Sequence, residues 1–419
     1  MKAKDPNCSF CGRKKSESLM LISGLDGHIC DHCAEQANNI VEKELGGSPE
    51  SITDINSTTG EKGGKKLPTP IEIKEHLDQY VIGQDQAKRT LSVAVYNHYK
   101  RLNSKKNSKK SDDVEIEKSN ILMIGETGTG KTLLAKTLAK ILDVPFCIAD
   151  ATVLTEAGYV GDDVESILSR LLQVANYKPE LAERGIIYLD EMDKISRKGD
   201  NASITRDVSG EGVQQGLLKI LEGTISNVAP EGGRKHPDQK YIKVDTTNIL
   251  FICGGAFDGI ERIISRRVQK QELGFKSSLN REIQDKKLLS LVSPPDLRAF
   301  GLIPELIGRL PILTALEPLD KPALQSILSD PKNALLKQYQ HLFSLDNIKL
   351  SIADDAIDFI VDMAFENKLG ARGLRGICEL ILQDFMYEAP SLKGKSELII
   401  TKAIAEEKWN RADSQKFAS

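Results

Sequence analysis

The sequence lacks the features of several large protein classes. Aromatic residues make up only 5% of its 419 residues, and the formal net charge is −3. A slightly acidic chain with few aromatic rings is not typical of nucleic-acid-binding proteins. No apolar run approaches the length needed to span a bilayer, and residues 1–6 lack the apolar core of a signal peptide. We therefore expect a cytoplasmic protein with no membrane partner and no nucleic-acid partner.

Cysteine is also scarce, and four of the seven cysteines are clustered near the N-terminus. Cys8 and Cys11 form one C-x-x-C pair, and Cys30 and Cys33 form another. This spacing predicts a structural Zn²⁺ site that holds together a module too small to fold around its own core. Two disulfides are the alternative, which a cytoplasmic location disfavours. A catalytic zinc is not expected, because four sulfurs leave no open position.

A glycine-rich stretch carries the clearest chemistry. Residues 125–132 read Gly-Glu-Thr-Gly-Thr-Gly-Lys-Thr and fit the phosphate-binding pattern G-x-x-x-x-G-K-[ST]. The apolar run 121–124 before it predicts a buried strand, and the spacing of apolar residues in 134–142 predicts a helix after it. Lys131 can then reach the β- and γ-phosphates of a nucleotide, and the Thr132 hydroxyl can hold Mg²⁺. The alternative, a turn that only joins strand to helix, does not account for both pattern and context.

An acidic pair strengthens this interpretation. Residues 186–189 predict a second buried strand, and Asp190 and Glu191 follow it directly. One carboxylate can reach the Mg²⁺ shell, and its neighbour can act as base on an attacking water.

Composition along the chain predicts its domain organisation. Residues 46–70 are rich in Gly, Ser, Thr, Lys and Pro and predict a flexible linker. Helical patterns dominate after residues 318–322. We expect a zinc-binding module in 1–45, the linker in 46–70, a large ATPase domain in 71–317 and a small helical domain in 318–419.

Three further stretches are expected to lack regular structure. Residues 103–118 are polar and lysine-rich and predict a surface insertion, and residues 261–285 are charged and irregular. The polar tail from Glu406 is expected to fray.

Together the zinc module, the phosphate loop, Asp190-Glu191 and the stretch Val81-Ile82-Gly83-Gln84 closely resemble the ClpX family of AAA+ unfoldases. The resemblance covers nearly the whole chain. It implies an α/β fold, with a P-loop large domain built on a parallel sheet and a smaller, mostly helical C-terminal domain. It also implies a homo-hexamer that uses ATP and Mg²⁺ to unfold tagged proteins, some presented by adaptors, and to thread them into the ClpP peptidase.

The resemblance also assigns roles to particular residues. Glu191 is implied as the catalytic base, and Arg309 as an arginine finger that reaches the ATP of a neighbouring subunit. Glu126 stands where the family usually has proline, but its side chain makes none of the backbone contacts, so binding is expected to survive. The implied nucleotide contacts are Val81, Ile82, Glu126, Thr127, Gly128, Thr129, Gly130, Lys131, Thr132, Leu133, Asp190 and Arg372.

Three loops are implied to contact proteins. Tyr159 and Val160 resemble the family's main pore loop, and Arg234, Lys235 and His236 its pore-entrance loop. Leu273, Gly274 and Phe275 resemble the tripeptide that docks into ClpP. The alternatives are an ordinary turn, a solvated basic turn and a local loop anchor. Residues 253–255, Cys-Gly-Gly, offer no polar side chain to sense the γ-phosphate, so no such sensor is assigned.

Two other functions compete with this interpretation. A DNA-acting AAA+ motor, such as a helicase or clamp loader, requires a basic stripe with stacking aromatics, which the composition disfavours. A non-enzymatic chaperone that binds ATP as a structural ligand does not require Glu191 or Arg309. No Ser-His-Asp or Cys-His constellation suggests an internal protease.

Overall fold

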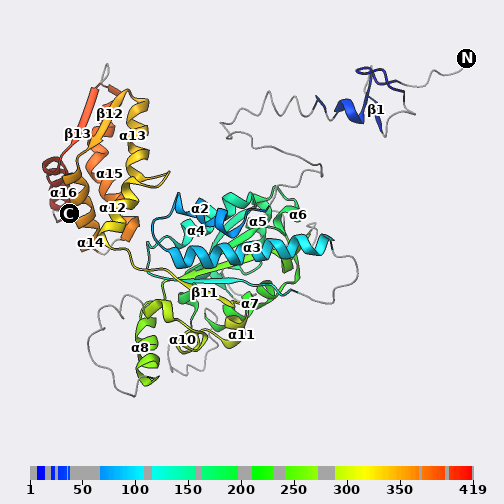
Figure 1. The fold of residues 1–419 in the computed structure, drawn as a ribbon, viewed down its shortest axis with the longest axis horizontal. Helices are drawn as coiled ribbons and strands as arrows, with labels where there is room; N and C mark the ends of the chain where they lie inside the picture. Colours follow the sequence, from blue (N-terminus) through cyan, green and yellow to red (C-terminus); the bar gives the residue numbers. More distant parts are fainter. Residues whose placement is uncertain are drawn as a thin grey trace, which may run out of the picture. The chain divides into compact units, whose positions relative to one another are not determined.

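The computed structural model divides into two compact units, Met1–Lys65 and Lys66–Ser419 (Figure 1). The described residues are 7–14, 20–23, 27–34, 36–37, 67–107, 116–155, 162–196, 210–229, 241–271, 288–367, 370–391 and 396–417. Within these ranges no helix is both long and apolar enough to cross a membrane.

The N-terminal unit contains a small antiparallel hairpin. Strand β1 (Leu21–Ser23) pairs with β2 (His28–Cys30), and Leu21 lies opposite Cys30. Among the described residues of this unit, the core consists of Cys8, Cys30 and Cys33, with Leu21 and Ile29 packed against them. A core this small cannot stabilise a fold by apolar burial alone, which agrees with the need for a bound metal.

A five-stranded parallel sheet forms the centre of the second unit. Its order is β11-β3-β10-β7-β4, so the strand that precedes the phosphate loop lies between β11 and β10. The strands span Ile121–Ile124 (β3), Phe146–Asp150 (β4), Ile186–Asp190 (β7), Leu250–Gly255 (β10) and Ile312–Ala315 (β11). The predicted strands at 121–124 and 186–189 are confirmed.

Alternate residues of these strands serve two cores. Ile121 and Met123 pack on one face of the sheet, while Leu122 and Ile124 pack on the other. All four are fully buried, as expected for a parallel strand covered by helices on both faces. The first face is covered by α2 (Pro70–Asp78), α3 (Asp85–Asn107) and α4 (Lys131–Leu142).

Helices of the opposite face complete the large domain. Figure 1 shows α8, α10 and α11 gathered below the sheet, away from α2, α3 and α4. The elements that contribute to this second core include α5 (Ser166–Val174), α7 (Glu211–Glu222), α8 (Ile260–Gln271), α10 (Pro294–Phe300) and α11 (Pro304–Gly308). Shorter elements are β5 (Leu154–Thr155), β6 (Asp162–Asp163), α6 (Pro179–Ala182), β8 (Ile225–Val228) and β9 (Ile242–Asp245).

The C-terminal part has a core of its own. It runs from Leu324 to Ala405 and is mostly helical, as predicted. Its helices are α12 (Lys321–Ser329), α13 (Leu335–Leu345), α14 (Asp354–Glu366), α15 (Gly370–Glu388) and α16 (Lys402–Phe417). Two parallel strands, β12 (Ile348–Ile352) and β13 (Ser396–Ile400), join them. The sequence analysis did not predict this pair. The boundaries expected at 45, 70 and 317 stay predictions.

Three expectations about irregular segments were wrong where the structure describes the chain; residues 108–115 and 272–285 lie outside the described residues. Residues 260–271 form α8, because Ile260 and Ile264 face the core at helical spacing. Residues 103–107 continue α3 rather than opening a surface insertion. Lys118, at the other end of that predicted insertion, donates to the Thr246 carbonyl at 2.9 Å. The tail is helical to Phe417 as part of α16.

Candidate functional site

The phosphate loop connects β3 to α4 with the geometry that the pattern predicts. Gly128 and Gly130 have φ of 89° and 100°, a backbone conformation that glycine adopts without strain. Gly130 is the N-cap of α4, and no side chain caps this helix end. The first N–H groups of α4 and the positive end of its dipole are therefore available to an anion.

Lys131 is buried at the start of α4. Its ammonium donates to the carbonyls of Gly125 at 2.6 Å and Glu126 at 3.0 Å. Burial lowers the pKa of Lys131, and the nearby Asp190 carboxylate opposes this shift. Thr129 donates its hydroxyl to the Glu126 carbonyl at 2.8 Å, whereas the Glu126 side chain is exposed. The departure from the family pattern thus lies on the outside of the loop.

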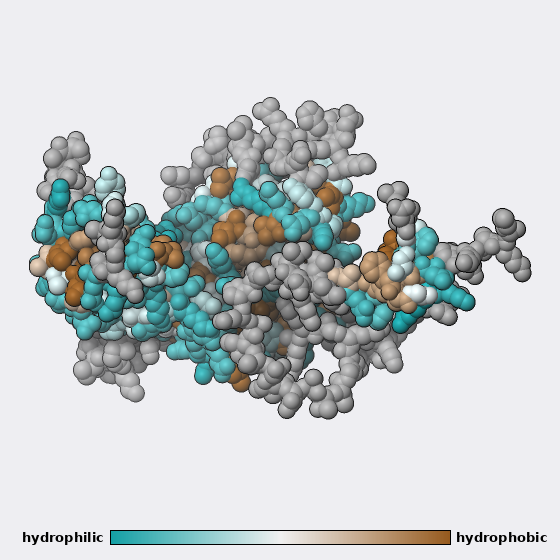
Figure 2. Space-filling model, turned by 90° about the horizontal axis from the view of Figure 1, so that it is seen from above, coloured by the Kyte–Doolittle hydropathy of each residue, from teal (hydrophilic) through white to brown (hydrophobic). Residues whose placement is uncertain are grey.

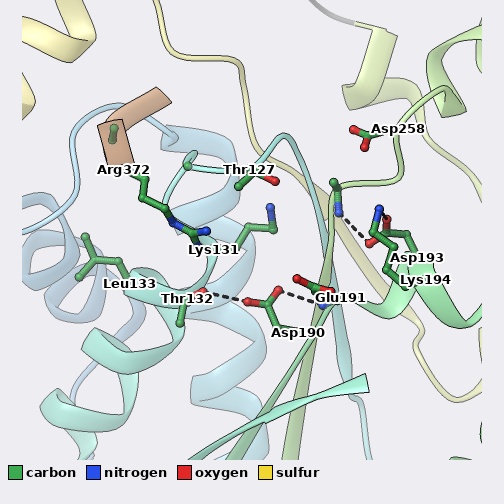
Figure 3. Close-up of a pocket in the computed structure, with 14 residues that line it drawn as sticks. Thr127, Lys131, Thr132, Leu133, Asp190, Glu191, Asp193, Lys194, Asp258 and Arg372 are labelled. Carbon is green, nitrogen blue, oxygen red and sulfur yellow. Dashed lines mark hydrogen bonds and ion pairs between the residues drawn. The ribbon is translucent and has the colours of Figure 1, made fainter. Parts of the chain in front are cut away.

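The acidic pair lies at the carboxyl end of β7, next to α4 (Figure 3). The Thr132 hydroxyl donates to Asp190 Oδ2 at 3.3 Å, and the backbone N–H of Glu191 donates to Asp190 Oδ1 at 3.0 Å. Glu191 has φ 58° and ψ 34°, a left-handed conformation that costs a non-glycine residue about 1–3 kcal/mol. This strained turn places the Glu191 carboxylate on the pocket instead of continuing the strand.

One pocket collects most of the predicted nucleotide contacts. Arg372 enters it from α15 of the C-terminal part, and Figure 3 shows its guanidinium near Lys131. The predicted residues that line this pocket are Thr127, Gly128, Gly130, Lys131, Thr132, Leu133, Asp190, Glu191 and Arg372. Their individual roles stay predictions.

Five predicted residues lie outside this lining. Val81 is buried beside the loop, with its Cγ1 atom 3.9 Å from the position that a Cβ would take at Gly130. Ile82 follows Val81. The Glu126 carbonyl accepts from the Thr129 hydroxyl and from the Lys131 ammonium, so these two residues hold the shape of the loop. Arg309 Nε donates to the Glu222 carboxylate at 3.0 Å, and the Arg309 side chain is 51% exposed.

The sequence analysis missed an acidic residue in the pocket. Asp193 lies three residues after Asp190, in the short 3-10 turn Met192–Ile195 that follows the strand, and no local sequence pattern indicates it. Its side chain is buried and accepts from the backbone N–H of Ala256 at 3.0 Å and from Lys194 at 3.2 Å. Figure 3 shows this contact on the wall opposite Arg372, where Asp258 also lines the pocket. Asp193 thus fixes the turn after β10 to the turn after β7.

The four N-terminal cysteines converge as the spacing predicts. Their sulfurs all lie within 4.8 Å of one another. A tetrahedral Zn²⁺ with bonds of about 2.3 Å holds its sulfurs about 3.8 Å apart, so the four side chains fit this metal. Burial raises the pKa of Cys8, but the backbone N–H groups of Cys11, Phe10 and Cys30 outweigh it and lower the pKa to about 6. His28 contacts Ser23 and is not part of the cluster.

Cys147, Cys253 and Cys378 are buried free thiols. Eight predicted protein-contact residues lie outside the described residues. They are Tyr159, Val160, Arg234, Lys235, His236, Leu273, Gly274 and Phe275.

Three stretches of the chain match known families. Residues 6–43 match the ClpX C4-type zinc finger, and residues 116–313 match an AAA domain described under the Cdc48 subfamily. Residues 319–401 match the C-terminal, D2-small domain of ClpB protein.

Curated proteins resemble the chain over almost its full length. The ATP-dependent Clp protease ATP-binding subunit ClpX of Bacteroides thetaiotaomicron is 58% identical over 98% of this chain and 97% of its own. The proteins of the same name from Porphyromonas gingivalis and Bacteroides fragilis are also 58% identical, over 98% and 97% of this chain and 98% and 96% of their own. The parallel sheet, the phosphate loop and the four-cysteine module agree with these matches, and the cofactors are ATP, Mg²⁺ and Zn²⁺. The chain therefore belongs to the ClpX family of AAA+ ATPases.

Proposed function

We propose that the chain unfolds tagged proteins with the energy of ATP and passes them through a hexameric pore into the ClpP peptidase, in the cytoplasm. One observation carries this proposal. A single pocket joins the phosphate loop, the Asp190-Glu191 pair and Arg372 from a part of the chain with a separate core. A site of this composition can hydrolyse a nucleotide and can transmit the state of that nucleotide to the C-terminal part of the chain.

Each pocket residue has a distinct part in the proposed reaction. The N–H groups at the start of α4 and the Lys131 ammonium bind the phosphates once this ammonium turns from the Gly125 and Glu126 carbonyls. The Thr132 hydroxyl and Asp190 hold Mg²⁺, which neutralises charge on the phosphates when it is bound. Glu191 accepts a proton from the attacking water. Arg372 changes the angle between the two parts of the chain as the nucleotide changes.

Two features support the proposed hexamer: the position of Arg309 and the exposed apolar side chains of the large domain. Arg309 is half-exposed and held by Glu222, outside the pocket of its own chain, so a finger at this position would serve a neighbour. Figure 2 shows apolar patches on the large domain among hydrophilic side chains. Val174, Tyr177 and Leu181 are 53%, 44% and 47% exposed near the junction of α5 and α6. Exposed apolar side chains on one face favour contact with other subunits.

The proposed protein contacts follow from the resemblance and from the names of the relatives. Tyr159 and Val160 would grip the translocating chain, and Arg234, Lys235 and His236 would meet a substrate's C-terminal carboxylate at the pore entrance. Leu273, Gly274 and Phe275 would dock into ClpP. The relatives are named as ATP-binding subunits of an ATP-dependent Clp protease, which supports ClpP as the partner.

The proposal is tested by asking which polymer stimulates the ATPase. Purified protein is assayed with ATP and Mg²⁺ alone, with a tagged unfolded polypeptide, and with single- or double-stranded DNA. The proposal predicts stimulation by the polypeptide and none by DNA. Stimulation by DNA alone would instead indicate a nucleic-acid motor.

A further inference from the structure

Gly254 and Tyr188 lie side by side on neighbouring strands of the sheet. β10 and β7 are paired in parallel, with Ile252 opposite Tyr188 and Cys253 opposite Leu189. A Cβ built at Gly254 would lie 2.2 Å from the Tyr188 hydroxyl oxygen and 2.9 Å from the ring carbon that carries it. Any side chain at position 254 would therefore displace the hydroxyl. Gly254 belongs to the stretch 253–255, in which a γ-phosphate sensor was sought. Because glycine has no side chain, it leaves room there for the Tyr188 hydroxyl from β7.

The Tyr188 hydroxyl uses this room to reach the acidic pair. Tyr188 is fully buried and donates to Asp190 Oδ1 at 3.1 Å. A phenol hydroxyl carries its proton at neutral pH, so it acts as a donor to the carboxylate.

Three donors contact the Asp190 carboxylate, two at Oδ1 and one at Oδ2. Oδ1 accepts from the Tyr188 hydroxyl and from the Glu191 backbone N–H at 3.0 Å, and Oδ2 accepts from Thr132 at 3.3 Å. Each carboxylate oxygen offers about two lone-pair sites, so Oδ1 is saturated and Oδ2 keeps one site. A Thr132 hydroxyl that donates its hydrogen to Oδ2 still has lone pairs for a cation. The free acceptors of Asp190 and Thr132 thus lie together.

We propose that Tyr188 is a positioning residue that fixes the rotation of the Asp190 carboxylate, so that Oδ2 stays on the side of Thr132 and Mg²⁺. This inference rests on the proposed function, which assigns Asp190 and Thr132 to Mg²⁺. Without the Tyr188 hydroxyl, Oδ1 keeps only the Glu191 backbone as an anchor, and the carboxylate can turn. The gain in nucleotide affinity that Mg²⁺ provides should then decrease, whereas the affinity measured without Mg²⁺ should stay the same.

A tyrosine that only fills the core makes a different prediction. Its loss would lower stability and would weaken nucleotide binding equally with and without Mg²⁺. The chain offers a matched control in Tyr99, which is also buried and donates its hydroxyl to the Arg184 carbonyl at 2.9 Å. Tyr99 is not among the residues that line the pocket. Tyr188→Phe and Tyr99→Phe each remove one buried hydroxyl and keep the ring.

The experiment measures the affinity of the full chain for a fluorescent ADP analogue, in Mg²⁺ and in EDTA. The ratio of the two dissociation constants gives the Mg²⁺-dependent gain, and it does not depend on the fraction of protein that has folded. Loss of a hydrogen bond to a carboxylate should reduce this gain by about tenfold in Tyr188→Phe. The dissociation constant in EDTA should stay within about twofold of wild type. Tyr99→Phe should keep the full gain.

A second variant approaches the same contact from the other strand. Gly254→Ala retains the Tyr188 hydroxyl but displaces it from Asp190, so this variant should also reduce the Mg²⁺-dependent gain. An unchanged gain in Tyr188→Phe overturns the inference while leaving the proposed function intact. A wild-type protein with no Mg²⁺-dependent gain would instead contradict the assignment of Asp190 and Thr132, and the inference with it.

Discussion

Arg309 and Glu222 form an ion pair at the surface of the large domain. Arg309 Nε lies 3.0 Å from Glu222 Oε1, and both side chains are about half-exposed. An ion pair this exposed contributes little to the stability of the chain, typically about 0–1 kcal/mol. The guanidinium can therefore exchange Glu222 for another anion at small cost, as the proposed arginine finger requires.

Mixing two inactive variants tests whether Arg309 acts between subunits. Arg309→Ala lacks the finger but keeps the base, and Glu191→Gln lacks the base but keeps the finger. Each alone should hydrolyse ATP orders of magnitude more slowly than wild type. Mixed oligomers should regain activity, because an Arg309→Ala subunit receives its finger from a Glu191→Gln neighbour. The control mixes Lys131→Ala with Glu191→Gln, in which no subunit has both nucleotide and base.

If Arg309 acts within its own chain, no subunit of the mixture has both the arginine and the base. The mixture would then be no more active than the average of its components. This outcome would exclude an arginine finger supplied by a neighbouring subunit.

Replacement of a single cysteine ligand tests the zinc site. Cys30→Ser should lose the bound metal and unfold the N-terminal unit, since its core consists mainly of the cysteines. Basal ATPase should persist, because the pocket belongs to the second unit. Metal analysis of the wild type should give about one Zn²⁺ per chain. His32→Ala is the control and should keep the metal; loss of zinc in this variant would place a histidine among the ligands.

A buried histidine predicts how stability depends on pH. Burial lowers the pKa of His98 from an ordinary value of 6.5 to about 3, and Nε2 of the ring donates to the Asn248 carbonyl at 3.0 Å. The unfolded chain therefore binds a proton at His98 below pH 6.5 that the folded chain does not. Stability from this group is complete above pH 6.5 and is lost as pH falls toward 3. Between pH 7 and pH 5 the loss should be about 2 kcal/mol.

Denaturant titrations at both pH values measure this loss. His98→Gln should show a smaller decrease than wild type, and His341→Gln, on the surface, should behave as wild type. An equal decrease in wild type and His98→Gln would show that other groups cause the pH dependence.

The proposed docking tripeptide allows partner binding to be separated from unfolding. Deletion of Leu273, Gly274 and Phe275 removes an apolar anchor but no residue of the nucleotide pocket. ATP hydrolysis and unfolding should continue, while degradation in the presence of ClpP is lost. Normal co-sedimentation of the deletion variant with ClpP would refute this assignment.

Local sequence predicted the elements that carry the nucleotide chemistry. The phosphate loop, the strand before it and Asp190-Glu191 each depend on neighbouring residues, so their patterns are complete within a dozen positions. The contact between Gly254 and Tyr188 depends on the register of β10 against β7, which no local pattern contains. The pairing of β12 with β13 is equally distant in sequence. Because α8 also carries many charged residues, its apolar face around Ile260 and Ile264 was not recognised from the sequence.

Whether this chain uses ATP to unfold proteins can be measured on a stable, tagged fluorescent protein. The substrate is incubated with wild type, Glu191→Gln or Tyr159→Ala, and its native fluorescence is followed with ATP and Mg²⁺. Wild type should abolish the fluorescence, whereas Glu191→Gln should bind ATP but leave the substrate native. Tyr159→Ala should keep its ATPase and unfold the substrate much more slowly, because the proposed pore loop no longer grips it. Wild-type protein that hydrolyses ATP at a normal rate and leaves every tagged substrate native would show that this chain is not an unfoldase.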